Sequence, residues 1–439
     1  MHKIQSVHIR LLCSLLIFLG TSFSLMGQLG DIYIKAGQFY DSEKSVLHRD
    51  QVIRVEGNEI AEILDFQSIP GGAEIIDLTD YTVLPGLIDA HTHVLFSQDA
   101  TADFAEHSIH TLVMESDALR ALRGAKRARS YLDVGITSIK DLGNSGQFLD
   151  VALRDAINEG STAGPRIFAS GPILAATGGQ IYGVLPAHQH IIDGEYRIVK
   201  GADDAVNAVR EHVNQGDDLI KICADNLPNR TLLSVNEMKA IAETAHTNGL
   251  TVTAHCVTNQ SAWNAITAGV DGIEHGFNIA DTTLALMAKK KVYLVPTENS
   301  RAYMETYARL AGYAEDEREW IDYYMDNMEG RLERAISKGV TIVAGSDNYT
   351  DIGVSAGQSS IDMLRAYVEA GMKPLDILQS ATYLAAKSMN KEQSIGSLSP
   401  GAFADIIAVR GDLEQDFLAT MDRLVFMMKD GVVYLEDGE

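Results

Sequence analysis

Two histidines at the end of an apolar segment are the residues of this sequence that most directly indicate chemistry. The segment covers residues 84–95 and reads LPGLIDAHTHVL, so His91 and His93 are two positions apart. Alternate residues of an extended chain point to the same side. Two imidazoles in this arrangement can bind one metal ion, although similar pairs also occur in proteins without a metal.

Four further ionisable residues lie in or directly after other short apolar segments. They are Lys221 in LIKIC, His255 after TVTA, His275 after GIE and Asp347 after TIVAGS. Each has an ordinary alternative, because a histidine at a strand end is often structural and an aspartate can cap a helix. Their joint occurrence at strand ends favours one shared site.

Lys221 is the most informative of these residues. Its apolar neighbours predict burial, and a buried, charged and unpaired amine is costly. A neutral amine with a lowered pKa can react with carbon dioxide, and the two oxygens of the resulting carbamate can bridge two metal ions. The structural alternatives are that Lys221 reaches solvent or pairs with Asp225.

The elements that carry these residues predict an α/β fold. Eight apolar segments, within residues 84–95 and at 136–143, 165–174, 219–225, 251–257, 272–277, 292–297 and 341–348, alternate with helix-length amphipathic runs. This alternation predicts a (β/α)8 TIM barrel, in which catalytic groups gather at the carboxyl ends of the strands. Ser234 and Glu237 have the spacing of a capping box. The acidic segment 301–338 is expected to be a solvated helical excursion, with a lid over the site as the alternative.

The two ends of the chain differ from the middle in their predicted secondary structure. Short β-rich pieces in residues 28–84 and 397–439 predict a small β-sandwich domain built from both termini, with the barrel at 85–396 and a hairpin turn at Lys429-Asp430-Gly431. Residues 1–27 combine a basic start with a short apolar run, which is typical of a signal peptide and short for a membrane span. We therefore expect export to the periplasm or secretion, without stable membrane association.

Composition excludes several classes of partner. The formal net charge of the 439-residue chain is −24, which argues against binding to nucleic acid or to anionic membrane surfaces. After the predicted signal peptide only Cys223 and Cys256 remain, too few for a disulfide framework, and their pairing is left open.

The sequence resembles the metal-dependent amidohydrolase superfamily, in the branch of imidazolonepropionase-like proteins and prolidase-like Xaa-Pro dipeptidases with a carboxylated lysine. The matching motifs are PGLIDAHTH at 85–93, TSIKDLG at 137–143, GPRIFASG at 164–171, DLIKI at 218–222, TAHCV at 253–257, GIEHG at 272–276, GSD at 345–347 and PGAFADI at 400–406. Their order covers nearly the whole chain after the N-terminal segment.

This resemblance implies a site with two divalent metal ions, for which zinc is preferred and manganese or cobalt is also compatible. It implies that the first ion is held by His91 and His93 with Asp347, the second by His255 and His275, and that Lys221, carboxylated by carbon dioxide, bridges them. A hydroxide between the two ions would attack an amide carbonyl, with Asp347 as base and then acid. The neighbouring Asp89 and Glu274 are expected to orient imidazoles or support the fold.

Several positions that bear on the choice of substrate depart from the residues that are usual in this family. The loop TGGQ ends in Gln180 where the family commonly has histidine, Ala224-Asp225-Asn226-Leu227 replaces a frequent Ala-Ser-Gly-Gly, and Gln358 stands where relatives often have another histidine. Gln180 and Arg230 are the candidate substrate contacts, the latter for a carboxylate, with a surface role as its alternative. A second histidine pair, His188 and His190, lies in a loop and is not expected to bind metal.

These features predict hydrolysis of an amide or peptide bond in a small substrate, most simply an Xaa-Pro dipeptide. One alternative is an N-acyl amino acid or cyclic-amide hydrolase. Another is a non-catalytic barrel scaffold, which the retention of all six ligand positions disfavours. A homo-oligomer is also expected.

Overall fold

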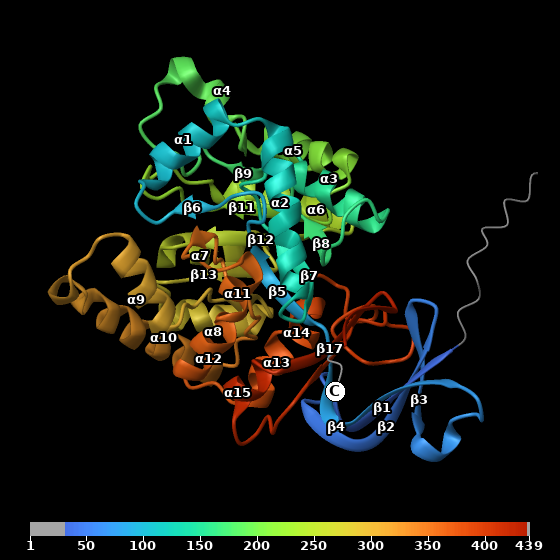
Figure 1. Cartoon of the computed structure of the whole chain (residues 1–439). Helices are drawn as coiled ribbons and strands as arrows, with labels where there is room; N and C mark the ends of the chain where they lie inside the picture. The colour runs from blue at the N-terminus through green and yellow to red at the C-terminus, as the bar shows by residue number, and fades with distance from the viewer. Residues whose placement is uncertain (1–30, 437–439) are drawn as a thin grey trace, which may run out of the picture.

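The chain is built around a ring of parallel strands, with helices outside the ring and a second sheet beside it (Figure 1). The computed structural model describes residues 31–436, so the predicted signal peptide lies outside the described residues. No helix in this part of the chain is long and apolar enough to cross a membrane.

The ring consists of short parallel strands whose residues are almost all buried. Along the chain these are β5 (Leu87–Thr92), β7 (Ile136–Asp141), β8 (Arg166–Ala169), β9 (Ile173–Ala175), β11 (Leu219–Cys223), β12 (Thr251–Cys256), β13 (Gly272–His275) and β14 (Tyr293–Val295). They pair in the orders β5-β7-β8 and β9-β11-β12-β13-β14, and β10 (Tyr196–Ile198) adds to the edge at β9. Strands covered on both faces carry continuous apolar runs, which explains why these segments were recognisable in the sequence.

The third predicted strand, 165–174, is interrupted in the structure. Ser170, Gly171 and Pro172 separate β8 from β9. Gly171 has φ +61°, a left-handed conformation that ends the extended backbone of β8, and Pro172 has no N–H for a ladder. The backbone N–H of Asp218 nevertheless donates to Ala169 O at 2.8 Å, so β8 also contacts the start of β11.

The eighth predicted strand, 341–348, does not form a regular strand. Leu294 N donates to Thr341 O and Val343 N donates to Leu294 O, both at 2.9 Å, which links the segment to β14. On the other side, Ala90 N donates to Ala344 O at 2.9 Å, which links it to β5. The segment therefore closes the ring through backbone hydrogen bonds to both neighbours, but Ala344 N donates to Ser380 O, so no continuous ladder forms.

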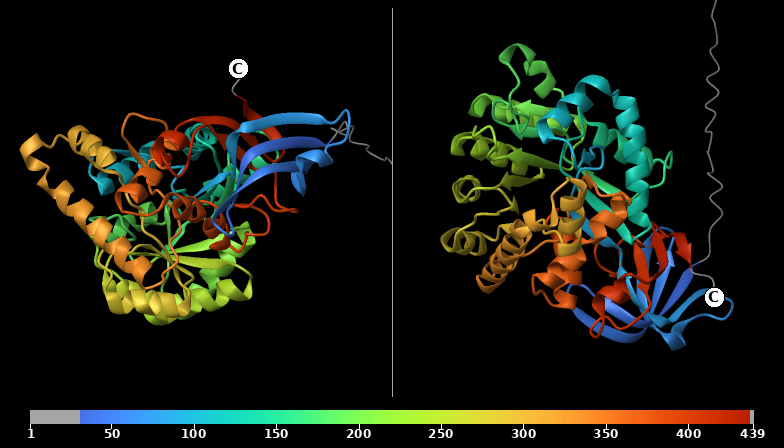
Figure 2. Two further views of the ribbon diagram at one scale, coloured as in Figure 1. Left: turned by 90° about the horizontal axis from the view of Figure 1, so that it is seen from below. Right: turned by 60° about the vertical axis from the view of Figure 1, so that its left-hand side comes forward.

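Helices follow most of the strands and cover the ring. The longer ones are α1 (Phe104–Met114), α2 (Asp117–Leu132), α3 (Leu149–Asn158), α5 (Ala202–Gln215), α6 (Val235–Thr247), α7 (Asn259–Ala268), α8 (Asp281–Lys290), α9 (Arg301–Leu310) and α10 (Glu319–Ser337). The predicted capping box of α6 is confirmed, because the side chains of Ser234 and Glu237 each accept from the other's backbone N–H. The predicted helical excursion forms α9 and α10, on the side of the ring away from the second sheet (Figure 2).

Shorter helices complete the described chain; the first follows β9, and the others follow the segment that closes the ring. They are α4 (Gln189–Ile192), α11 (Ala356–Ile361), α12 (Met363–Glu369), α13 (Pro374–Ser380), α14 (Tyr383–Lys387) and α15 (Phe417–Met421). Two short strands, β6 (Gln98–Asp99) and β15 (Thr350–Asp351), pair in parallel at the rim.

The second sheet contains strands from both ends of the described chain. Its order is β18-β17-β16-β4-β1-β2-β3, with the strands β1 (Ile32–Asp41), β2 (Val46–Glu56), β3 (Glu59–Asp65), β4 (Glu74–Pro85), β16 (Ile406–Val409), β17 (Leu424–Lys429) and β18 (Val432–Glu436). Ile60 N donates to Ala402 O and Ala404 N to Asn58 O, so the β3 edge meets the segment before β16. The described strands therefore make one curled sheet around an apolar cluster rather than two separate sheets. The predicted turn at Asp430-Gly431 is confirmed, with both residues at positive φ.

Candidate active site

All six residues predicted as metal ligands line one cavity of about 390 Å³. The cavity lies at the carboxyl ends of the ring strands: His91 comes from β5, Lys221 from β11, His255 from β12 and His275 from β13. His93 directly follows β5, and Asp347 follows the segment that closes the ring. Parallel strands place their carboxyl ends on one rim, so residues far apart in sequence converge there.

Three histidines are oriented by hydrogen bonds at Nδ1. His91 Nδ1 is 2.7 Å from Glu274 Oε2, and His93 Nδ1 is 2.7 Å from Gly143 O. His275 Nδ1 is 2.9 Å from Thr297 Oγ1, whose own proton goes to Pro296 O. Because acceptors face Nδ1, each ring, when neutral, carries its proton on Nδ1 and leaves Nε2 for a metal ion.

His255 is oriented in a different way. Its Nε2 is 3.3 Å from Gln180 Nε2 and 3.6 Å from Asp225 Oδ1. Asp225 in turn accepts hydrogen bonds from Val257 N, Thr258 N and the hydroxyl of Ser261, so its carboxylate is held in place. The Nε2 of His255 is thus the ring atom that faces Gln180 and Asp225.

Lys221 is enclosed in the ring and has no carboxylate within ion-pair distance among the described residues. It is 2% exposed, and its Nζ lies 3.4 Å from His91 Nε2. Neither structural alternative for this residue is present, because Lys221 does not reach solvent and Asp225 is engaged elsewhere. Burial lowers the pKa of the amine.

Below the histidines, a buried charge network forms the floor of the cavity. Glu274 accepts from His91, lies in a close hydrogen bond with Thr253 Oγ1, and is 3.5 Å from the Nζ of Lys140. Burial alone would raise the pKa of Glu274, but Lys140 and His91 hold that pKa well below its usual range. Glu274 is therefore an anion that orients the His91 ring, as expected.

Asp89 supports the backbone instead of an imidazole. Its Oδ1 accepts from the backbone N–H groups of His91 and Ser346 at 3.0 and 2.9 Å, and its Oδ2 accepts from the Ser346 hydroxyl at 2.6 Å. Asp89 thus joins β5 to the segment that ends in Asp347. Two roles were expected for Asp89, orienting an imidazole or supporting the fold, and its hydrogen bonds correspond to the second.

Asp347 is the central acidic group of the cavity. Its Oδ1 is buried without a hydrogen-bond partner in the described chain, although it lies 3.2 Å from His93 Nε2 and 3.5 Å from His91 Nε2. Ligand atoms of His91, His275 and Asp347 lie within 4.8 Å of one another. An orphaned carboxylate oxygen facing imidazole nitrogens fits a divalent cation.

The protonation states of His91 and His255 are also suited to metal binding. Burial is the main cause that lowers the pKa of His91 and of His255 to about 4, and the nearby Lys221 adds to the effect. These rings are therefore neutral at physiological pH, the state in which imidazole binds metal. The residues present are thus suited to hold divalent metal ions.

Three residues at the rim have backbone conformations that are uncommon outside glycine. His275, Asp347 and Thr297 have φ values of +68°, +53° and +52°. Each such conformation costs on the order of 1–3 kcal/mol and is typical of functional sites. The side chains of His275 and Asp347 line the cavity, and Thr297 contacts the Nδ1 of His275.

The two candidate substrate contacts lie in different places. Gln180 lines the cavity, but Arg230 does not, because it lies exposed on the loop after β11. Gln358 is also exposed, and accepts from the Ser355 backbone in the capping box of α11. His188 and His190 lie exposed near α4, outside the cavity. The two cysteines of the described residues, Cys223 and Cys256, are free and buried.

Aromatic side chains complete the cavity and were not predicted. They are Phe104, Tyr182, Phe277 and Tyr349. Two of them could have been found from the sequence, since Phe277 and Tyr349 come two residues after the predicted ligands His275 and Asp347. Phe104 and Tyr182 enter from α1 and from a loop, where no periodicity marks them.

A ring of parallel strands with histidines, a buried lysine and an aspartate at its carboxyl rim defines the class of barrel hydrolases that use metal ions. Residues 82–435 match the amidohydrolase family, and the chain belongs to that family. It is an enzyme of the hydrolase class.

Two relatives and one solved structure are similar to this chain. Ochratoxinase from Aspergillus niger is 28% identical over 362 residues, covering 76% of this chain and 71% of that protein. Imidazolonepropionase from Symbiobacterium thermophilum is 25% identical over 348 residues, covering 76% of each. The crystal structure of a Xaa-Pro dipeptidase with bound methionine in the active site superposes with a TM-score of 0.78 at 28% identity, covering 92% of this chain and 100% of that chain.

Proposed function

We propose that this protein hydrolyses an amide or peptide bond in a small substrate with two divalent metal ions, and that its preferred substrates are dipeptides of the Xaa-Pro type. The observation that carries the proposal is the convergence of Lys221 with four histidines and the unpaired Asp347 oxygen in one cavity. Similarity to a Xaa-Pro dipeptidase structure over nearly the whole chain supports the substrate class.

The proposed ligand set is that of the sequence prediction. His91, His93 and Asp347 would hold one ion, His255 and His275 would hold the other, and Lys221, once carboxylated, would supply oxygen ligands to both. The Nζ of Lys221 is suited to carboxylation because it is buried without an ion-pair partner in the described chain, so the neutral amine can attack carbon dioxide and release one proton. Metal ions bound there, with zinc preferred, would lower the pKa of a water molecule and polarise the substrate carbonyl.

The remaining chemistry belongs to the side chains of this protein. Asp347 lies beside His91 and His93 and has a free carboxylate oxygen, so it can accept the proton of the attacking water and return it to the departing nitrogen. Although burial alone would raise it, His91 and His93 keep the pKa of Asp347 low, so the base is ionised before reaction. Glu274, Gly143 and Thr297 keep the histidine rings in their binding orientation.

A second candidate activity, hydrolysis of N-acyl amino acids, is favoured by the aromatic lining of the cavity. Phe104, Tyr182, Phe277 and Tyr349 offer flat apolar faces on which an acyl group can pack. Gln180 lies beside His255 and is placed to donate a hydrogen bond to a substrate oxygen. A cyclic amide would use the same groups.

Metal content and turnover test the proposal together. Elemental analysis of the purified protein should give about two metal ions per chain, and Lys221→Ala and Asp347→Asn should each lose turnover by at least about a hundredfold, with metal lost from Lys221→Ala. Lys239→Ala, an exposed lysine on α6, is the matched control and should behave as the parent protein. One metal ion or none, unaffected by Lys221→Ala, would refute the bridged centre.

The substrate class is decided by a panel run on the same samples. Xaa-Pro dipeptides, other dipeptides, N-acyl amino acids and a cyclic amide should be hydrolysed in that order of kcat/KM. Faster hydrolysis of N-acyl amino acids than of all dipeptides would transfer the proposal to the second candidate. Bound metal without turnover of any panel member would favour a scaffold role.

We further propose that the chain is exported to the periplasm or secreted, and that it works as a homo-oligomer. The first proposal rests on the basic and apolar pattern of residues 1–27. N-terminal sequencing of the protein recovered outside the cytoplasm should begin between residues 23 and 29, and an intact Met1 would refute processing. Light scattering of the same sample gives the oligomeric state.

A further inference from the structure

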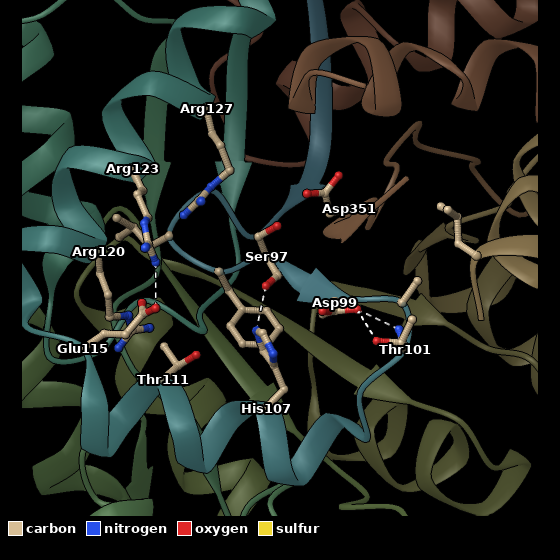
Figure 3. A pocket seen from close by; sticks show the side chains of 14 residues that line it. Ser97, Asp99, Thr101, His107, Thr111, Glu115, Arg120, Arg123, Arg127 and Asp351 are labelled. Atoms are coloured by element: carbon tan, nitrogen blue, oxygen red, sulfur yellow. Dashed lines mark hydrogen bonds and ion pairs between the residues drawn. The ribbon is translucent and has the colours of Figure 1, made fainter. Parts of the chain in front are cut away.

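A second cavity of about 440 Å³ lies outside the metal-ligand cluster, between α2, α1 and the loop that follows His93. Figure 3 shows Arg120, Arg123 and Arg127 of α2 on one side of this space. On the other side lie Asp99 and Asp351, which come from the paired strands β6 and β15. The cavity therefore has a basic wall and an acidic wall.

The basic wall carries donors without partners. Arg127 donates from Nε to Val94 O at 2.6 Å, and has no carboxylate within ion-pair distance in residues 31–436. Burial lowers the pKa of this guanidinium, and Arg123 lowers it further. Arg120 is 3% exposed and pairs with Glu195 through its terminal nitrogens, but its buried Nε has no partner in the described chain.

Arg123 completes this wall and is the most accessible of the three. Its guanidinium makes one ion pair, with Glu115 at 2.7 Å, and its side chain is 51% exposed. An arginine fork has five donors, so most of the Arg123 donors remain free for a ligand carboxylate.

The carboxylates of the acidic wall lack ion-pair partners in the described part of the chain. Asp99 and Asp351 are direct partners in the parallel pairing of β6 and β15, and neither has an ion pair within the described part of the chain. Like charges opposite each other on neighbouring strands destabilise the pair unless a cation lies nearby. One oxygen of each carboxylate is engaged, by Thr101 and by Gly353, which leaves the other oxygen of each free.

We propose that this cavity binds a small zwitterion, namely a free α-amino acid or a short unblocked peptide, with its carboxylate at Arg123 and Arg127 and its ammonium group at Asp99 and Asp351. Leu95, Phe96 and Leu310 supply an apolar surface for the ligand side chain. A phosphate would meet two uncompensated carboxylates, and a metal cation would meet the arginines, so neither single charge satisfies both walls. The proposal does not depend on the proposed function.

Isothermal titration of the full chain, stripped of metal with a chelator to prevent turnover, tests the site. The probes are L-leucine and glycyl-L-leucine, with N-acetyl-L-leucine, L-leucinamide and sodium phosphate as controls. We expect saturable binding of at least one zwitterion, and binding at least about tenfold weaker for each blocked compound and for phosphate, because each lacks one charge pair. The stronger of the two zwitterions identifies the ligand as an amino acid or a peptide.

Variants of cavity residues distinguish binding in this cavity from binding at the metal site. Arg123→Gln and Asp351→Asn should each weaken binding at least about tenfold. Arg129→Gln, an exposed arginine of α2 paired with Asp133, should leave binding unchanged. The thermal midpoint of each variant shows that it is folded. Absence of saturable zwitterion binding, equal binding of the blocked compounds, or unchanged binding in both cavity variants would overturn the proposal.

Discussion

The buried pair of Lys140 and Glu274 provides the strictest test of how the floor of the site is built. Both side chains are fully buried, and Lys140 Nζ lies 3.5 Å from Glu274 Oε1 and 3.4 Å from Tyr293 OH. Replacing Lys140 by Met leaves Glu274 as a buried anion without its cation. Replacing Glu274 by Gln leaves Lys140 as a buried cation without its anion.

The size of the effect follows from the separation of the charges. At 3.5 Å and an effective dielectric constant of about 20, two unit charges attract by about 5 kcal/mol. Removing one partner of such a buried pair is expected to cost about 3–5 kcal/mol of unfolding free energy. Removing both eliminates the uncompensated charge, so the double variant should cost at least about 2 kcal/mol less than the sum of the singles.

Urea unfolding of metal-stripped protein measures these free energies without a contribution from bound metal. The parent, Lys140→Met, Glu274→Gln and the double variant form one cycle. Additivity of the two single effects within about 0.5 kcal/mol would show that the charges do not interact, and would refute the account of the floor. Glu274→Gln should in addition lower metal content, because the Gln amide does not hold the His91 proton as an anion does.

Two further predictions concern packing and pH. Gly345→Ala should destabilise the protein by about 1–3 kcal/mol and lower its metal content, because the added Cβ would lie 2.9 Å from His91 N; Gly330→Ala in α10, where the space is open, is the control and should not destabilise. Asp204→Asn should destabilise by less than about 1 kcal/mol at pH 7, because Arg197 bonds to this partly exposed carboxylate and lowers its pKa below the unfolded value of 3.8. That difference should shrink as pH falls through the folded pKa in urea titrations, and a difference that grows toward low pH would contradict the sign.

The sequence predicted those parts of the structure that follow from periodicity. Apolar strands buried on both faces produce continuous hydrophobic runs, and the polar residues that end them stand at the rim of the ring. Lys221, His255 and His275 could be placed for this reason. The capping box of α6 and the turn at Asp430-Gly431 were also predictable, because their chemistry is local.

The remaining features depend on contacts that are distant in sequence. The segment 341–348 has the composition of a strand, but its hydrogen bonds are divided between β14, β5 and Ser380. Arg230 has the charge for a substrate contact, but its loop directs it to solvent. Lys140 lies in the strand-like segment TSIKDLG, and only the folded ring shows that it faces Glu274.

The sheet shared by both ends of the chain has a consequence for the order of folding. β4 leads directly into the ring, and its partner β16 pairs Ile406 with Pro85, more than 300 residues apart. During synthesis, β1 to β4 can pair with one another, but the edge of β4 stays open until the ring has been made and residues 406–436 have followed. Such long-range pairing is slow, and an open edge can pair with other chains. We therefore expect the last thirty or so residues to control how much of the newly made protein reaches its native form instead of aggregating.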